Sequence, residues 1–171
     1  DEDDQLKIVK DIMKELELTD EVKPKQCVSF ISYMKSLNIS CDELVKRNTL
    51  TEEEKIKSKI YLKYEEFLQT NQYLDFDDLL IKSVDILKKS PLVKKKWQNK
   101  YEHILVDEFQ DTNDIQYELL TLILGEYCSL FVVGDPDQTI YTWRGANVSL
   151  IMDFKKRFKP SRDIVLNQNY R

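Results

Sequence analysis

The chain has 171 residues, the size of one ordinary domain or two small ones. Hydrophobic residues make up 42% and charged residues 33%, a balance that can build a core and excludes a wholly disordered chain. The net charge of −5 excludes a basic field over the whole surface for nucleic acid but allows a local basic patch. The sequence has no long apolar run and no signal peptide, so we expect a cytoplasmic protein without a membrane span.

Three residue types are scarce in ways that exclude common sites. None of the three glycines is followed by lysine, so the chain contains no glycine-rich phosphate loop. A single histidine, His103, argues against a histidine triad or a histidine zinc site. The cysteines are odd in number and widely spaced, which predicts buried free thiols rather than disulfides or a metal site. They are Cys27, Cys41 and Cys128.

The first part of the chain has the pattern of helices only. Apolar residues recur at helical spacing from Leu6 onward, and Pro24 suits the first turn of a second helix. Ser40 is placed to cap a short helix, and Thr51–Glu54 forms a capping box before a long one. Because this region has no glycine and no cluster of catalytic residue types, we predict an all-helical subdomain over residues 1–73.

From Leu74 onward, short apolar runs begin to alternate with helical patterns. Such runs, which lack polar alternation, are typical of parallel strands buried on both faces. The predicted strands are His103–Val106, Leu130–Val133 and Ile164–Leu166, and the predicted helices between them are Asp114–Leu124 and Asn147–Phe158. We therefore predict an α/β fold for residues 74–171, a parallel sheet with flanking helices.

Polar side chains follow the first two predicted strands. Open parallel sheets place ligands at the carboxyl ends of their strands, where this chain has Asp107 and Glu108 and, after the second strand, Gln138. One of two adjacent carboxylates can hold a hydrated Mg²⁺ while the other orients a water molecule. The alternative is an acidic turn in which Asp111 or Thr112 caps the next helix.

Aromatic residues with adjacent arginines occur at two further places. Tyr141 and Trp143 beside Arg144 suit stacking on unpaired bases together with a phosphate contact, although a core aromatic pair explains them equally well. Near the end of the sequence, Tyr170 suits stacking on a purine and Arg171 suits contact with a phosphate.

Three strings in a fixed order carry a family resemblance. DEFQDT at 107–112, VVGDPDQTIYTWRGA at 132–146 and QNYR at 168–171 resemble the UvrD/Rep/PcrA family of superfamily 1 DNA helicases. LDFDDLL at 74–80 also resembles the segment by which that family's helical subdomain returns to its first motor domain. The resemblance implies a partial RecA-like P-loop NTPase domain, subdomain 1A at 74–171, with an inserted helical subdomain, 1B, at 1–73.

The resemblance implies a role for each matching residue. Asp107 matches the Walker B aspartate that binds Mg²⁺, and Glu108 matches the general base that activates water for attack on ATP. Gln138 in motif III matches the sensor of the γ-phosphate. Tyr141 and Trp143 match aromatic residues that stack on single-stranded DNA.

The remaining matches concern the ATP site and the DNA site. Arg144 matches a residue that links the DNA site to the ATP site. In motif IV, Tyr170 matches the tyrosine that stacks on adenine, and Arg171 matches the arginine that stabilises transition-state charge. Gln110 lies within the Walker B string, but the resemblance gives it no role.

The function implied is that of an ATP-dependent helicase that uses Mg²⁺ and moves 3′ to 5′ along single-stranded DNA, unwinding duplex at junctions. The family's phosphate loop and second motor domain do not occur in these residues, so we expect an internal fragment that is inactive alone. We also expect residues 1–73 to be the better-ordered half. An incomplete sheet should leave residues 74–171 prone to self-association, rearranged, or loose near Asp135–Gly145.

Three alternatives remain at this point. The chain could belong to the motor of a helicase–nuclease complex. It could also be an inactive DNA-binding scaffold, although the intact Asp107, Glu108 and Gln138 argue against that. A two-metal nuclease would use Asp107 and Glu108 with Asp111 and Asp114, but Asp114 is better explained as first-turn helix charge.

Overall fold

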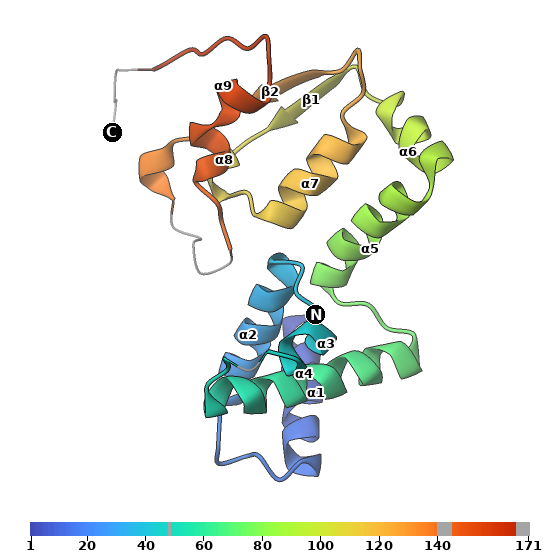
Figure 1. Cartoon of the computed structure of the whole chain (residues 1–171), viewed down its shortest axis with the longest axis vertical. Helices are drawn as coiled ribbons and strands as arrows, with labels where there is room; N and C mark the ends of the chain where they lie inside the picture. Colours follow the sequence, from blue (N-terminus) through green and yellow to red (C-terminus); the bar gives the residue numbers. More distant parts are fainter. Residues whose placement is uncertain (48, 140–144, 167–171) are drawn as a thin grey trace.

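The computed structural model describes residues 1–47, 49–139 and 145–166. Its first part contains only helices among the described residues, and Figure 1 shows them gathered apart from a small sheet. Their bounds are α1 Glu2–Glu15, α2 Pro24–Ser36, α3 Cys41–Val45 and α4 Glu52–Asn71. The predicted starts are confirmed: Pro24 opens α2, and Ser40 and Thr51 form the capping boxes of α3 and α4.

The larger buried core of the described chain lies among these four helices. Each helix turns its apolar stripe inward, and full burial of a large apolar side chain is worth roughly 1.5–3 kcal/mol. The core residues are Val9, Ile12, Met13, Val22, Cys27, Ile31, Cys41, Leu44, Ile60, Tyr61, Tyr64 and Leu68. No helix among the described residues is long and apolar enough to cross a bilayer.

All three cysteines are free, as predicted. Cys27 and Cys41 are buried, whereas Cys128 is partly exposed, so the prediction of buried thiols holds for two of the three. Burial raises the pKa of the Cys27 thiol to about 11, which keeps it protonated at neutral pH.

The second part of the chain alternates helices with two parallel strands. The bounds are α5 Phe76–Lys89, α6 Pro91–Gln98, β1 His103–Val106, α7 Asp114–Ile123, β2 Ser129–Val132, α8 Ser149–Met152 and α9 Phe154–Arg157. In the register of the strands, Ile104 lies opposite Leu130 and Val106 lies opposite Val132. The chain is therefore mixed α/β with a small parallel sheet, in which α7 is the crossover between β1 and β2.

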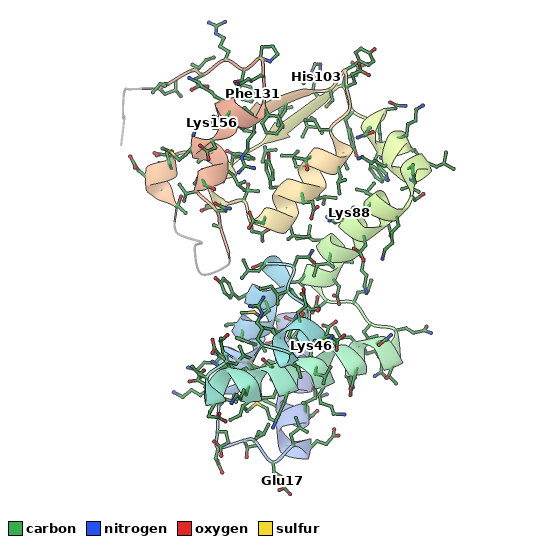
Figure 2. All side chains as sticks on the ribbon, in the orientation of Figure 1. Glu17, Lys46, Lys88, His103, Phe131 and Lys156 are labelled. Carbon is green, nitrogen blue, oxygen red and sulfur yellow. The ribbon has the colours of Figure 1, made fainter. Side chains whose placement is uncertain are left out.

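The prediction that these strands are buried on both faces is wrong. Along each strand the side chains alternate between partly buried and exposed. The covered side chains pack with Phe109, Leu120 and Leu150 in a second, smaller core. On the opposite face Leu105 is 73% exposed and Phe131, labelled in Figure 2, is 56% exposed. Alternate residues of a strand point to opposite faces, and the described helices cover only one of them.

The predicted third strand is also absent from the described chain. Ile164–Leu166 is not assigned to a strand, and its side chains are 71%, 74% and 90% exposed. No backbone hydrogen bond joins this segment to another described residue. An apolar run becomes a strand only when a neighbouring strand pairs with its N–H and C=O groups, so the composition of the segment was not sufficient.

The predicted helix Asn147–Phe158 is divided into two short helices, α8 and α9. Asp153 separates them with a ψ of 9°, far from the helical value of about −42°. Its carboxylate accepts a hydrogen bond from Lys156 Nζ at 2.6 Å. Aspartate is a weak helix former because its side chain competes for local hydrogen bonds, which accounts for a break at this residue.

A buried charge cluster joins the helical core to the start of α5. Lys35 of α2 has a side chain that is 1% exposed, and its Nζ lies 2.7 Å from Asp75 Oδ2 and 2.9 Å from Asp78 Oδ1. Glu65 of α4 completes the cluster, with its Oε1 at 2.7 Å from the same Nζ. Asp75 is also the N-cap of α5, and Tyr64 donates a hydrogen bond to it. The cluster therefore fixes the first turn of α5 against α2 and α4.

The lysine of this cluster stays charged. Burial by itself would lower the pKa of Lys35, but the adjacent Asp75 and Glu65 outweigh burial and hold that pKa above the usual lysine value. The pKa of Asp75 is lowered from its ordinary value, because Lys35 outweighs the effect of burial there too.

A second contact links α5 to α7, the crossover helix of the sheet. Lys88, labelled in Figure 2, extends from the last turn of α5 to Glu118 of α7, with its Nζ 2.5 Å from Oε1. Figure 1 shows α5 lying between the helical group and the sheet, so this helix connects the two parts of the chain.

We predict that Lys35→Ala lowers the free energy of unfolding by about 3–5 kcal/mol, because three carboxylates then lose their buried cation. Urea unfolding followed by circular dichroism measures the loss. Lys63→Ala is the matched control, since Lys63 pairs with Glu66 at the surface, and its effect should lie near the error of the measurement. Similar small losses in both variants would show that the cluster contributes no more than a surface pair.

Candidate functional site

The carboxyl ends of β1 and β2 lie next to each other and carry the candidate residues. Phe109 N donates to Val133 O at 2.9 Å, and Val133 N donates to Val106 O at 2.8 Å, so the pairing continues past the strands. Asp107 and Glu108 follow β1 directly, and a turn of 3₁₀ helix, η2 (Pro136–Gln138), follows β2. Polar groups from two separate stretches of sequence therefore share one edge of the sheet.

Asp107 is exposed and available to a cation. Its Oδ1 accepts a hydrogen bond from Glu108 N at 2.9 Å, and its Oδ2 accepts none from the described residues. Carboxylate oxygens are the donors that Mg²⁺ prefers, so Asp107 fits a magnesium ligand by its chemistry and exposure. A hollow of about 430 Å³ adjoins Asp107 and Glu108, with Leu80 of α5 and Leu120 of α7 among its lining residues.

Glu108 has a backbone conformation that is rare for its residue type. Its φ of 50° and ψ of 41° lie in the left-handed region, which costs a residue with a side chain about 1–3 kcal/mol. The sharp turn keeps the Glu108 side chain exposed at the sheet edge and leads into a 3₁₀ turn, η1 (Phe109–Asp111), whose Phe109 and Gln110 are buried. Such strain persists where surrounding structure enforces it, and it concentrates at functional sites.

Gln110 is buried beneath this edge with both ends of its amide bonded. The residue is 1% exposed. Its Nε2 donates to Glu108 Oε2 at 2.7 Å, and its Oε1 accepts from Asp135 N at 3.0 Å. The resemblance gave this residue no role. The sequence carried no local signal for it, because the Asp135 N–H that donates to Oε1 lies 25 positions further along the chain.

Gln138 lies at the same edge of the sheet, in the η2 turn that follows β2. Its Nε2 donates to Asp135 Oδ2 at 2.7 Å, while Asp135 Oδ1 accepts from Asp137 N at 3.0 Å. Asp135 is thus the N-cap of η2 and holds the Gln138 amide at the same time. The side chain of Gln138 itself is exposed at the edge.

Five of the predicted site residues lie outside the described part of the chain: Tyr141, Trp143, Arg144, Tyr170 and Arg171. Within it, hydrogen bonds through Gln110 and Asp135 join Glu108 to Gln138, and Asp107 directly precedes Glu108.

The proposed helix cap after β1 is corrected. Neither Asp111 nor Thr112 caps α7; Asn113 does, with its Oδ1 accepting from Gln116 N at 2.9 Å. In return Gln116 Oε1 accepts from Asn113 N at 3.1 Å, which completes a capping box. η1 occupies residues up to Asp111 and Thr112 is extended, so neither residue is placed to cap the helix. The start of α7 at Asp114 is the predicted one.

The two-metal nuclease finds no support in this geometry. Of the described acidic residues, the group of three close enough to share a metal ion is Glu65, Asp75 and Asp78, where the Lys35 ammonium already lies. Asp114 is occupied elsewhere, since its Oδ1 accepts from Asn147 Nδ2 at 2.8 Å. The four carboxylates of the nuclease hypothesis do not gather.

Comparison with known proteins decides the family. Residues 1–159 match the UvrD/REP helicase N-terminal domain. The chain belongs to the UvrD/REP helicase family. The match covers both the helical part and the strand ends.

Individual relatives of this family align along the whole chain. It is 41% identical to a probable DNA helicase II homolog of Mycoplasma capricolum and covers 24% of that protein. It is 39% identical to DNA helicase II of Haemophilus influenzae and 35% identical to the ATP-dependent DNA helicase PcrA of Staphylococcus aureus, covering 23% of each. The chain thus spans about a quarter of the length of these curated relatives.

Substitution of Phe109 tests whether the small core beneath this edge stabilises the fold. It is fully buried and meets Phe154 edge to face, with ring centroids 5.7 Å apart. We predict that Phe109→Ala lowers the free energy of unfolding by about 3–5 kcal/mol, the usual loss for a buried aromatic ring. Phe131→Ala is the control on the exposed face and should cost clearly less in a urea titration. An equal loss would mean that the exposed face is covered in solution.

Proposed function

We propose that this chain is the part of an ATP-dependent DNA helicase that carries the water-activating and phosphate-sensing side chains. The observation that supports this most directly is the meeting of Asp107, Glu108 and Gln138 at one edge of a parallel sheet. The family match and the names of the relatives, which are DNA helicases, support the same proposal. Residues 74–171 would form part of a RecA-like motor domain and residues 1–73 its helical insertion.

In this proposal the two carboxylates after β1 have different roles. Asp107 would hold Mg²⁺, which supplies charge neutralisation at the phosphates of ATP. Glu108 would accept a proton from the attacking water. Because Gln110 already donates to Oε2 of Glu108, Oε1 is the less engaged oxygen and would orient that water.

The remaining roles concern sensing and DNA. Gln138 would sense the γ-phosphate, and Tyr141 and Trp143 would stack on single-stranded DNA a few residues after that sensor. Arg144 would link the two sites. Tyr170 would stack on adenine. Arg171 would stabilise charge in the transition state.

The movement that would follow is ATP-driven translocation 3′ to 5′ along single-stranded DNA, with unwinding at duplex junctions. Repeated hydrolysis would be coupled to DNA through the short stretch between Gln138 and Arg144. That stretch is the shortest covalent path between the phosphate sensor and the proposed DNA contacts.

For the full-length protein, we predict that Glu108→Gln retains nucleotide binding but lowers DNA-stimulated ATP turnover by at least about 10²-fold, the scale for loss of a general base. Steady-state ATPase and equilibrium nucleotide-binding assays measure the two effects. Glu102→Gln, an exposed carboxylate before β1, is the control and should retain normal turnover. Turnover within a few-fold of the unsubstituted protein would leave Glu108 with a structural role only.

For DNA binding, we predict that Trp143→Ala weakens single-strand affinity by roughly 1–3 kcal/mol, the range for one stacked base. The loss should depend little on base sequence, and the salt dependence should stay the same, because stacking releases no counterions. Fluorescence anisotropy with labelled oligonucleotides measures both. Trp97→Ala is the control, at the other tryptophan of the chain; the ring of Trp97, on α6, lies 4.3 Å from Lys100 Nζ. Normal DNA affinity in Trp143→Ala with a lowered melting temperature would instead place Trp143 in the core.

A further inference from the structure

Gln110 is bonded in a way that fixes which end of its amide faces which neighbour. Its Nε2 points to a carboxylate oxygen of Glu108, and its Oε1 points to the backbone N–H of Asp135. A flipped amide would place its oxygen against that carboxylate and its NH₂ group against that N–H, so both contacts would become repulsive. The amide therefore has one satisfactory orientation, and it ties Glu108 to the residue that follows Gly134.

Gly134 gives independent support, because the backbone there makes room for the same amide. A Cβ added at Gly134 would lie 2.5 Å from Gln110 Oε1 and 2.9 Å from Ile151 Cδ1. The φ of Gly134 lies outside the left-handed region, so a glycine is required here for space and not for backbone freedom. The end of β2 is thus shaped around the Gln110 side chain.

The hydrogen bonds continue from this amide to the proposed sensor. Asp135 donates its N–H to Gln110 and accepts, through Oδ2, from Gln138 Nε2. Three consecutive bonds of 2.7, 3.0 and 2.7 Å therefore join Glu108, Gln110, Asp135 and Gln138. In this path Gln110 is buried and Asp135 is half-buried, whereas Glu108 and Gln138 at its ends are exposed. A displacement of the η2 turn would alter the support of the Glu108 carboxylate.

We propose that Gln110 is a positioning residue that holds Glu108 in its working orientation and makes that orientation depend on the turn Asp135–Gln138. The inference rests on the proposed function, in which Glu108 orients water. Gln110 touches neither nucleotide nor water in this scheme. It acts through Glu108 by bonding to Oε2, whereas Oε1 accepts no hydrogen bond from the described residues. A bond to one oxygen also restricts rotation of a side chain that the left-handed backbone of Glu108 already aims at the edge.

The test uses the full-length protein with two substitutions of similar size. Gln110→Glu keeps an acceptor for Asp135 N but sets a carboxylate against Glu108, and Gln110→Met removes both hydrogen bonds. We expect both to lower kcat for DNA-stimulated ATP hydrolysis by about 10–100-fold, the scale for loss of a residue that orients a reactive group. The KM for ATP should change by less than about threefold, because binding contacts remain. Gln116→Met, in the capping box of α7, is the control and should leave kcat unchanged.

A double-mutant cycle separates positioning from simple loss of stability. In the Glu108→Gln background, Gln110→Met should lower kcat little further, because the side chain that it positions no longer acts as a base. If the double variant instead shows the product of the two single losses in kcat, the inference is overturned. Gly134→Ala approaches the amide from the other side, and it should reproduce the fall in kcat at nearly constant KM. Normal kcat in Gly134→Ala with only a lower melting temperature would likewise overturn it.

The outcomes also separate this inference from the proposed function. If Glu108→Gln abolishes turnover while the Gln110 variants keep normal kcat, only the positioning role fails. If Glu108→Gln keeps normal turnover, the proposed function of the edge fails first.

Discussion

The ammonium group of Lys35 is the contact on which the arrangement of the whole chain depends. It lies among carboxylates from α4 and from the start of α5, and it comes itself from α2. A charge removed from water in this way is tolerated only when its partners surround it, so the three elements must arrive together. The direction in which α5 leaves the helical core is set at this point, and α5 then carries the chain to α7 through Lys88 and Glu118.

Local signals in the sequence predicted the helices well. Capping boxes at Ser40 and Thr51, and proline at Pro24, act within one helical turn, so the sequence alone contains the full interaction. Features that depend on distant residues were predicted less well. Ile164–Leu166 has the composition of a strand, but pairing is decided by a neighbouring strand, and composition does not report whether one is there. The pairing of Lys35 with three carboxylates was likewise missed, since they lie 30 or more positions further along the chain.

The same difference between local and distant interactions applies to the residues of the candidate site. Asp107, Glu108 and Gln138 could be found because polar residues directly after buried strands meet at one edge of a parallel sheet. Gln110 and Asn113 could not be placed in the same way. The bonds of Gln110 reach across to the turn after β2. Asn113, the N-cap of α7, follows the 3₁₀ turn that the left-handed Glu108 initiates. Composition also suggested strands buried on both faces, whereas burial depends on which helices pack against them.

At Glu108 the residue type that suits the left-handed backbone differs from the one that the proposed chemistry needs. Glycine relieves the steric cost of that conformation, and asparagine tolerates it better than glutamate, so either would suit the turn. Neither supplies a carboxylate. A search for thermostable variants that screened only for folding would therefore favour replacement of this residue, which in the proposed function would remove the base. Engineering for heat resistance should hold this position fixed and look for its gains in the helical core.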